Sequence, residues 1–415
     1  MKRCAVVTFG CKVNQYESQA LQERLRGAGF QVVRPDEDAE VYVLNTCTVT
    51  ETAYAEAART VRRIHRRRPD AEIAVTGCAA DSNRDEFLRM PGVRRVVVHD
   101  EKSALPLLLD DPRLEVGDLK PSIFDLRISG FEGHTRAFLK IQDGCDLHCS
   151  FCIIPKVRGA NVSRPFEEAV EEARRLAAAG YREIVLTGVH VGSFGKDSAG
   201  RSLIPDLVER LLAIPGLARV RLSSIEANEV DDRLIDAMAA SGGRFCPHYH
   251  LPLQSGDAGV LRDMRRRYSP DQFLRTVDRI RGKVDEPSFT TDVIIGFPTE
   301  TDAAFERTLD LCRRVGFSRI HIFPYSHRRG TDASSLPDLP SGVKKERHIR
   351  LQTLASELTA AYGEKFVHRD VDVLIEEPGK GYTERYLRAT VPGGRSNQLV
   401  RARVLAVRDG GLECG

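Results

Sequence analysis

The chain has 415 residues, of which 41% are hydrophobic and 29% are charged, and its formal net charge is +3. This length predicts two or three domains, and this composition is typical of a soluble globular protein. No apolar run is long enough to span a membrane, and the opening MKRCAVVTFGCK lacks the apolar core of a signal peptide. We therefore expect a cytoplasmic protein with no membrane partner.

Residues 1–115 alternate apolar strand patterns with helical patterns. The predicted strands cover residues 4–9, 41–45, 72–76 and 94–99. Helical spacing covers residues 15–29 and 51–67 between them. Nearly continuous apolar strands that are separated by helices predict a parallel α/β sheet.

Three of these predicted strands run into a cysteine: VVTFGC into Cys11, VYVLNTC into Cys47 and EIAVTGC into Cys78. The carboxyl ends of parallel strands share one edge of a sheet, so the three thiols should lie together. A single cysteine at a strand end is more often a small buried hydrophobic residue than a ligand. Three in successive turns, two of them after a glycine, favour a shared metal or cluster site.

Residues 116–133 lack this alternation of strand and helical patterns and are interpreted as a linker. From 134 to 363, six strand patterns alternate with helical ones and predict a partial (βα)6 barrel, whose active face is the carboxyl end of its strands. These strand patterns are AFLKIQ, EIVLTG, RVRLSSIE, HYHLPLQ, FTTDVIIGF and RIHIFPYS. Residues 364–415 change to short alternating strands broken by PGKG, PGG and DGG, which predict a small antiparallel β-barrel.

The loop GCDLHCSFC follows the first strand of the predicted barrel and carries Cys145, Cys149 and Cys152. Three neighbouring thiolates are soft ligands that select zinc, copper(I) or iron–sulfur clusters. Zinc would require a fourth ligand, for which His148 is the candidate, but structural zinc sites usually use two separated pairs. A [4Fe-4S] cluster with three cysteine ligands keeps one iron open, and the C-x3-C-x2-C spacing favours it.

This spacing, with Phe151 before the last cysteine, resembles the signature of radical S-adenosylmethionine (SAM) enzymes. In that superfamily the open iron binds the amino and carboxylate groups of SAM, and one electron from the cluster splits SAM to a 5′-deoxyadenosyl radical. Motifs along nearly the whole chain resemble the methylthiotransferase family: FGCKVNQYES, LNTC, TGC, GCDLHCSFCIIPKVRGANVSRP, HLPLQSG and DVIIGFPTE. GKGYTERYLRATV resembles the TRAM barrel, which binds RNA in that family.

The resemblance implies two [4Fe-4S] clusters, with Cys145, Cys149 and Cys152 as ligands of the radical cluster. The ligands of an auxiliary cluster would be the three strand-end cysteines, Cys11, Cys47 and Cys78. The auxiliary cluster would carry the sulfur, and SAM would supply both a methyl group and the radical. An electron donor such as a flavodoxin or ferredoxin and a sulfur source are implied as further partners.

The motifs GCKVNQYES and CSFCIIPKVRG most resemble enzymes that act on N6-threonylcarbamoyladenosine beside the tRNA anticodon, at position 37. The implied product is 2-methylthio-N6-threonylcarbamoyladenosine. Relatives that act on N6-isopentenyladenosine of tRNA, or on an aspartate of a ribosomal protein, share the same skeleton and remain alternatives. A non-catalytic, zinc-containing RNA-binding protein is the alternative from a different class.

Polar and glycine residues at the ends of the predicted barrel strands are candidate cofactor or substrate ligands, although turn and capping roles explain such residues equally well. They are Thr187, Gly188, Ser224, Glu226, Gln254 and Gly296. Many radical SAM enzymes place a Gly-Gly-Glu motif after the second strand. Here that position lacks a glutamate.

The remaining cysteines, Cys4, Cys246, Cys312 and Cys414, are expected to be packing residues, with Cys414 at a frayed end. Basic runs at 59–70, 264–268 and 326–330 are either solvated surfaces or phosphate contacts. Three basic residues near the cysteine loop are candidates for an RNA-facing rim, with a solvated loop as the alternative. These are Lys156, Arg158 and Arg164.

Overall fold

A computed structural model describes the whole chain except residues 49–50, 112, 117–118, 120, 132 and 198–199. The N-terminal part forms a five-stranded, fully parallel sheet in the order β2-β1-β3-β4-β5. Its strands are β1 (Arg3–Thr8), β2 (Gln31–Val33), β3 (Val41–Thr46), β4 (Glu72–Gly77) and β5 (Val93–Val97). The predicted parallel sheet is confirmed, and the three-residue edge strand β2 is the one that the hydrophobic pattern missed.

The helices of this part are α1 (Lys12–Gly27), α2 (Glu51–Arg67), α3 (Cys78–Ser82), α4 (Arg84–Leu88) and α5 (Leu105–Asp110). In α2 the buried residues Ala57, Val61 and Ile64 recur every three or four positions and cover the sheet. Most arginines of the basic run at 59–70 lie on the opposite, exposed face of α2. This run is therefore mainly a solvated helix face.

The middle part contains six parallel strands in two three-stranded sheets, ordered β10-β9-β6 and β11-β12-β13. They are β6 (Arg136–Lys140), β9 (Glu183–Thr187), β10 (Arg219–Leu222), β11 (His248–His250), β12 (Ser288–Ile295) and β13 (Arg319–Pro324). Isolated bridges such as Ser224 to His250 join β10 to β11. Among the described residues, β6 and β13 each pair along one side only, so the predicted partial barrel is confirmed and is open between them.

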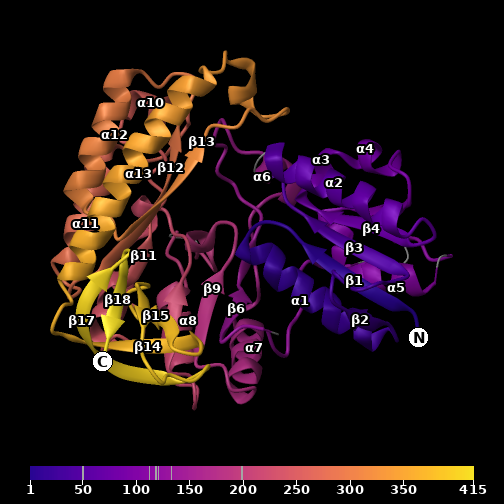
Figure 1. Ribbon diagram of the computed structural model, residues 1–415, viewed down its shortest axis with the longest axis horizontal. Helices are drawn as coiled ribbons and strands as arrows, with labels where there is room; N and C mark the ends of the chain where they lie inside the picture. The colour runs from indigo at the N-terminus through magenta and orange to yellow at the C-terminus, as the bar shows by residue number, and fades with distance from the viewer. Residues whose placement is uncertain (49–50, 112, 117–118, 120, 132, 198–199) are drawn as a thin grey trace.

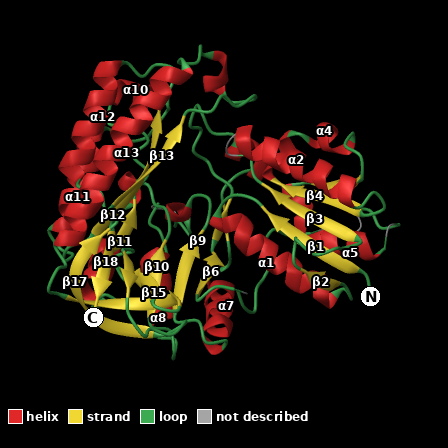
Figure 2. Ribbon diagram, in the orientation of Figure 1, coloured by secondary structure: helices red, strands yellow, loops and turns green. Residues whose placement is uncertain are grey.

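Helices cover the outside of this barrel, as Figure 2 shows for α11, α12 and α13 beside β12 and β13. They are α7 (Phe166–Ala178), α8 (Ile204–Leu212), α9 (Asp232–Ala240), α10 (Ala258–Asp263), α11 (Pro270–Arg281), α12 (Asp302–Val315) and α13 (Ser341–Glu364), whereas α6 (Ile154–Arg158) lies against α3 of the N-terminal part. A short hairpin of β7 (Gln142–Asp143) and β8 (Val162–Ser163) brackets the cysteine loop. The N-terminal sheet lies beside the open side of the barrel, with α1 against β6 (Figure 1).

The C-terminal part is a closed five-stranded barrel in the order β14-β15-β16-β18-β17. Its strands are β14 (Asp370–Glu377), β15 (Lys380–Thr383), β16 (Arg388–Thr390), β17 (Leu399–Arg408) and β18 (Gly411–Cys414). All pairs are antiparallel except β16 with β18, which is parallel and departs from the predicted antiparallel barrel. The prediction of a frayed Cys414 is wrong, because this residue closes β18 and is buried in the barrel core.

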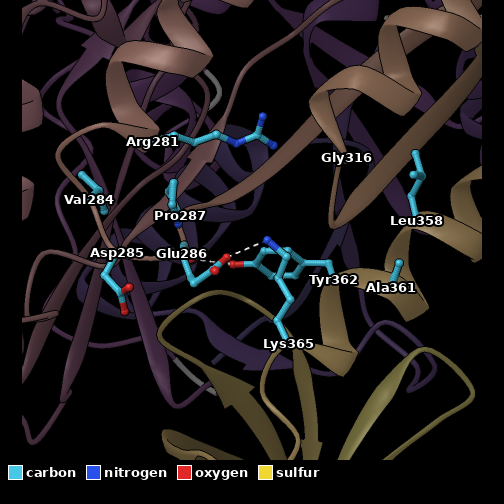
Figure 3. Close-up of a pocket in the computed structure, with 10 residues that line it drawn as sticks. All are labelled: Arg281, Val284, Asp285, Glu286, Pro287, Gly316, Leu358, Ala361, Tyr362 and Lys365. Carbon is cyan, nitrogen blue, oxygen red and sulfur yellow. Dashed lines mark hydrogen bonds and ion pairs between the residues drawn. The ribbon is translucent and has the colours of Figure 1, made fainter.

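The C-terminal barrel is attached at the amino ends of the core strands, opposite to the cysteine loop. Arg219 and Arg221 of β10 donate hydrogen bonds to backbone carbonyls of the barrel segments 372 and 382–384, while both pair with the buried Glu183. A pocket of about 400 Å³ lies at a second part of this joint (Figure 3). There Lys365 pairs with Glu286 at 2.7 Å, and no predicted site residue lines the pocket.

Among the helices of the described residues, none combines the length and apolar character that a membrane span requires.

Candidate functional site

The structure brings the turns that carry Cys11, Cys47 and Cys78 to one edge of the N-terminal sheet. Cys11 directly precedes α1, Cys47 follows β3, and Cys78 begins α3 directly after β4. The strands that lead into them are in matched register, with Thr8 opposite Asn45 and Thr46 opposite Gly77. The shared edge that the strand pattern predicts is therefore present, with Cys11 exposed and the other two thiols buried.

Two glycines allow these turns to approach one another. Gly10 has φ +88°, and a Cβ atom there would lie 2.6 Å from the Sγ of Cys47. Gly77 has φ +89°, and a Cβ atom there would lie 2.4 Å from the carbonyl oxygen of Thr46. Any larger residue at either position would combine a strained backbone with a steric clash. The glycines before Cys11 and Cys78 are therefore required for the close packing of these turns.

The second trio lies in the loop that follows β7. Gly144 begins it with φ +68°, and a Cβ atom there would lie 1.9 Å from the carbonyl oxygen of Ala160. Burial raises the pKa of the Cys152 thiol to about 12, and the charges of the neighbouring Cys149 and Cys145 act in the same direction. His148, the candidate fourth zinc ligand, is exposed.

Two buried arginines donate to sulfur atoms, one in each trio. Arg266 donates through Nη1 to the Sγ of Cys149 at 3.2 Å, and it also pairs with Glu226. Arg158 donates through Nε to the Sγ of Cys78 at 3.1 Å. Because a cationic donor stabilises a thiolate, both contacts suit cysteines that act as anionic ligands.

Arg158 belongs to a buried ionic network between the two trios. Its guanidinium contacts Glu17 of α1 and Asp143 of β7, each at 3.0 Å. Lys102 and Lys140 also pair with Glu17. The network joins the N-terminal sheet to the barrel. Glu17 and Asp143 could in principle bind a metal ion together with His99, but here both carboxylates pair with the cations of the network.

The prediction that Arg158 and Arg164 form an RNA-facing rim is wrong, because both are buried. Arg164 pairs with Glu172 at 2.8 Å and donates to the hydroxyl of Tyr16 at 2.9 Å. Both partners hold the guanidinium of Arg164 within the interface between α1 and the barrel. Of the three predicted rim residues only Lys156 is exposed, and it donates to the carbonyl of Gly330.

The candidate cofactor residues at the strand ends differ in their surroundings. Thr187 ends β9 and is buried, and Gly188 packs so closely on Gln142 that a Cβ atom would lie 2.9 Å from its side-chain oxygen. Ser224 bridges to β11, and Glu226 reaches the radical-type loop through Arg266. These four residues lie at the same end of the barrel as the cysteine loop.

The last two candidates have left-handed backbones. Gln254 has φ +61° and bridges to Val293 of β12. Gly296 has φ +69°, and its amide donates to the carboxylate of Glu300 at 2.7 Å. The methylene groups of Lys344 fill the space beside Gly296. Contacts within the chain account for the backbone conformation of both residues, and their role as cofactor ligands stays a prediction.

Sequence reasoning missed Arg266 and His190. His190 pairs with Glu229 at 2.9 Å. Burial opposes its protonation, but hydrogen bonds with Cys145 and Glu229 outweigh this effect and raise its pKa to about 9. The basic run MRRRY pointed to Arg266 only as a surface cation, whereas no local pattern marks His190.

The described cysteines fit iron–sulfur clusters. All six are free thiols, they form two separate groups of three, and two of them accept a hydrogen bond from a buried arginine. Soft thiolate trios with cationic donors to sulfur are suited to clusters with one open iron.

Comparisons with known proteins agree with this geometry. The Radical SAM superfamily model matches residues 139–312, and a model described as Uncharacterized protein family UPF0004 matches residues 3–99. A radical SAM methyltransferase, TsrM from Kitasatospora setae, superposes with a TM-score of 0.58 over 80% of this chain and 75% of its own, and at 17% identity this likeness shows the fold alone.

Curated relatives extend over nearly the whole chain. The threonylcarbamoyladenosine tRNA methylthiotransferase of Thermotoga maritima is 38% identical over 99% of this chain and 96% of its own length. The Bacillus subtilis enzyme of the same name is 36% identical over 98% and 94%. A tRNA-2-methylthio-N(6)-dimethylallyladenosine synthase of Cereibacter sphaeroides is 37% identical over 98% and 96%. With this identity over its full length, the chain belongs to the family of radical SAM tRNA methylthiotransferases.

Proposed function

We propose that this protein methylthiolates C2 of N6-threonylcarbamoyladenosine at position 37 of tRNA. The observation that carries the proposal is the meeting of two cysteine trios, from separate parts of the chain, beside helix α6: Cys78 packs against Ile153, which directly follows Cys152. One trio suits radical formation and the other suits sulfur delivery, and a methylthiotransferase requires both. The two relatives described first above share this substrate in their names.

Cys145, Cys149 and Cys152 would hold the radical cluster, and Cys11, Cys47 and Cys78 the auxiliary cluster. When bound, the clusters and SAM supply the one-electron chemistry and the methyl and sulfur groups that replace the C2 hydrogen of the adenine by SCH3. The proposed role of Arg266 is to orient Cys149 while it neutralises Glu226. The surrounding barrel wall restricts water around the reacting base.

The C-terminal barrel is the proposed tRNA-binding part. Its outer surface exposes several arginines, which can neutralise phosphates without reading sequence. They are Arg388, Arg395, Arg401, Arg403 and Arg408. Acidic partners such as Asp370 and Glu413 pair with some of them, so tRNA would have to displace these exposed ion pairs.

The proposed reaction also consumes one electron for radical formation and one sulfur atom for each product. We therefore include a reduced flavodoxin or ferredoxin as electron donor and a separate sulfur source among the partners.

The proposal is tested by mass spectrometry of tRNA nucleosides from a strain that lacks this gene. We expect 2-methylthio-N6-threonylcarbamoyladenosine to disappear and its unthiolated precursor to accumulate. Loss of the isopentenyl analogue instead would show that the substrate assignment is wrong. Elemental analysis of anaerobically prepared protein provides a second test, in which about eight irons with matching sulfide support the enzyme and zinc without sulfide excludes it.

A further inference from the structure

Three polar side chains form a cluster on neighbouring strands of the barrel: His250 of β11, Asp292 of β12 and His321 of β13. Nε2 of His250 lies 3.3 Å from the carboxylate of Asp292, and the rings of His250 and His321 have centroids 5.9 Å apart. Asp292 and His321 are direct neighbours in the strand register. One nitrogen or oxygen ligand atom from each of the three lies within 4.8 Å of the others.

This cluster lies away from the hydrophobic core. Asp292 and His321 are partly accessible, whereas Val293, the next residue of β12, is fully buried. Alternate residues of a strand point to opposite sides, so the cluster lies on the barrel side that does not face the packed helices. A groove of about 790 Å³ follows β13 and is lined by His321 and by Tyr386 of the C-terminal barrel. His321, the one cluster member that lines this groove, can therefore be reached from the side of the C-terminal barrel.

Lys12 extends toward the same cluster from the N-terminal sheet. It directly follows Cys11 and is exposed as a residue, yet burial of its ammonium group lowers its pKa, while the charges of Tyr386 and Asp292 act in the opposite direction. Burial lowers the pKa of His321 to about 4. Burial opposes ionisation of Asp292, but the hydrogen bond with His250 outweighs this effect and lowers the pKa of Asp292; the charge of Lys12 makes a smaller contribution to the lowering of each pKa. Lys12 thus lies between the N-terminal trio and this cluster, with Asp292 as a nearby carboxylate.

We propose that Lys12, His250, Asp292 and His321 form the subsite for the threonyl group of the substrate. This inference rests on the proposed function. The threonyl group carries one carboxylate and one hydroxyl group, so the carboxylate would bind Lys12 and the imidazole of His321. The carboxylate of Asp292, which His250 orients, would accept the hydroxyl. An isopentenyl group carries none of these polar atoms and would make none of these contacts with Lys12, Asp292 or His321.

Two histidines and one carboxylate are also a common set of metal ligands. Here the positive charge of Lys12 opposes a divalent cation. Both nitrogens of His250 already have partners, because Nδ1 lies 2.9 Å from the hydroxyl of Thr290 while Nε2 faces Asp292. An anionic, hydroxyl-bearing ligand satisfies all four residues, and a metal ion would satisfy only three.

The test uses the cluster-loaded enzyme and an anticodon stem-loop RNA with three forms of the base: threonylcarbamoyladenosine, its carboxylate methyl ester and isopentenyladenosine. Binding is measured by fluorescence anisotropy, and turnover is measured by product mass. We expect the wild-type enzyme to prefer the free carboxylate over the ester by roughly 10- to 100-fold, the range for a hydrogen bond to a charged group. Lys12→Met should reduce this ratio to near one, and His321→Phe should reduce it in part.

Lys12→Arg keeps the charge and should retain the preference, which separates recognition from damage to the neighbouring Cys11. Lys283→Met, which removes an exposed lysine two residues after the end of α11, is the matched control. Iron and sulfide content is measured for each variant, because only variants with both clusters are compared. An unchanged ester ratio in cluster-loaded Lys12→Met would overturn the subsite, as would an additional bound metal that His321→Phe removes.

Failure of the proposed function gives a different result. In that case the wild-type enzyme would not convert the threonylcarbamoyladenosine RNA at all and would convert the isopentenyladenosine RNA instead.

Discussion

The Nε atom of Arg158 lies 3.1 Å from the Sγ of Cys78 and donates a hydrogen bond to it. The same guanidinium pairs with Asp143, two residues before Cys145. A single buried cation therefore contacts a cysteine of one trio and supports the loop that carries the other.

Replacing Arg158 with methionine should destabilise the protein strongly. Glu17 and Asp143 would lose a partner in a site that excludes water, and breaking a buried ion pair costs about 3–5 kcal/mol. The free energy of unfolding of the cluster-free protein measures this loss. Arg210→Met is the matched control, because Arg210 pairs with Glu167 at the surface and its loss should cost about 1 kcal/mol or less. Equal losses in the two variants would contradict the proposed importance of the network.

Arg158→Lys should separate charge from geometry. Lysine keeps the cation, but it cannot donate to Cys78 and both carboxylates from one planar group. We expect stability to recover in large part while the reduction potential of the auxiliary cluster still shifts from that of the wild type, as measured by electron paramagnetic resonance during a redox titration. A wild-type potential would show that the contact with sulfur has no electronic role.

Gly10→Ala should abolish the auxiliary cluster selectively. The added methyl group would lie 2.6 Å from the Sγ of Cys47, at a backbone φ of +88°. The expected iron content falls from about eight to about four per chain, because the radical-type loop is untouched. Gly29→Ala is the control: Gly29 has a similar φ of +85°, yet its added methyl group has no neighbour within 4 Å. That variant should lose some stability and keep its iron.

Cys149→Ala should remove the other cluster. We expect about four irons to remain, held by the auxiliary trio, and the production of 5′-deoxyadenosine from SAM to cease. Liquid chromatography of the reaction mixture measures that product. Continued formation of 5′-deoxyadenosine would contradict the assignment of Cys149 as a ligand of the radical cluster.

Acid should weaken the joint between the barrel core and the C-terminal barrel. Burial opposes ionisation of Glu183, but Arg219, Arg221 and Arg136 outweigh it and hold its pKa well below the ordinary 4.5. A carboxyl group with a lowered folded-state pKa stabilises the protein fully above its ordinary pKa and loses this contribution as the pH falls toward the folded value. Glu183→Gln should therefore cost most stability at pH 7 and progressively less below about pH 4.5.

Unfolding of the wild type and of Glu183→Gln at several pH values measures this difference. A gap in stability that stays constant down to about pH 3 would show that Glu183 has an ordinary pKa.

The sequence predicted the parts of the site that depend on local pattern. Strand periodicity followed by Gly-Cys or Thr-Cys placed Cys11, Cys47 and Cys78 at one sheet edge, because strand direction and side-chain alternation are set by neighbouring residues. The alternation of strands and helices also predicted the partial barrel. The short strand β2 and the parallel pairing of β16 with β18 were missed, since each depends on contacts with distant strands.

Long-range charge pairing could not be predicted in this way. Arg158 and Arg164 were interpreted as surface cations, because a basic residue just after a loop usually faces water. Their partners Glu17 and Tyr16 lie more than 140 positions earlier in the chain. The roles of the six cysteines as ligands, and of the strand-end residues as cofactor contacts, remain predictions for the experiments above.

Helix α6 has only five residues, so it extends for about 7.5 Å. Cys152 precedes it by two positions, and its last residue, Arg158, is bonded to Cys78. An inserted or deleted residue in this helix would rotate Arg158 by about 100° and move it away from the sulfur of Cys78. Cys78 also packs against Ile153, the residue after Cys152, so α6 brings one cysteine of each trio to the same short segment of the chain.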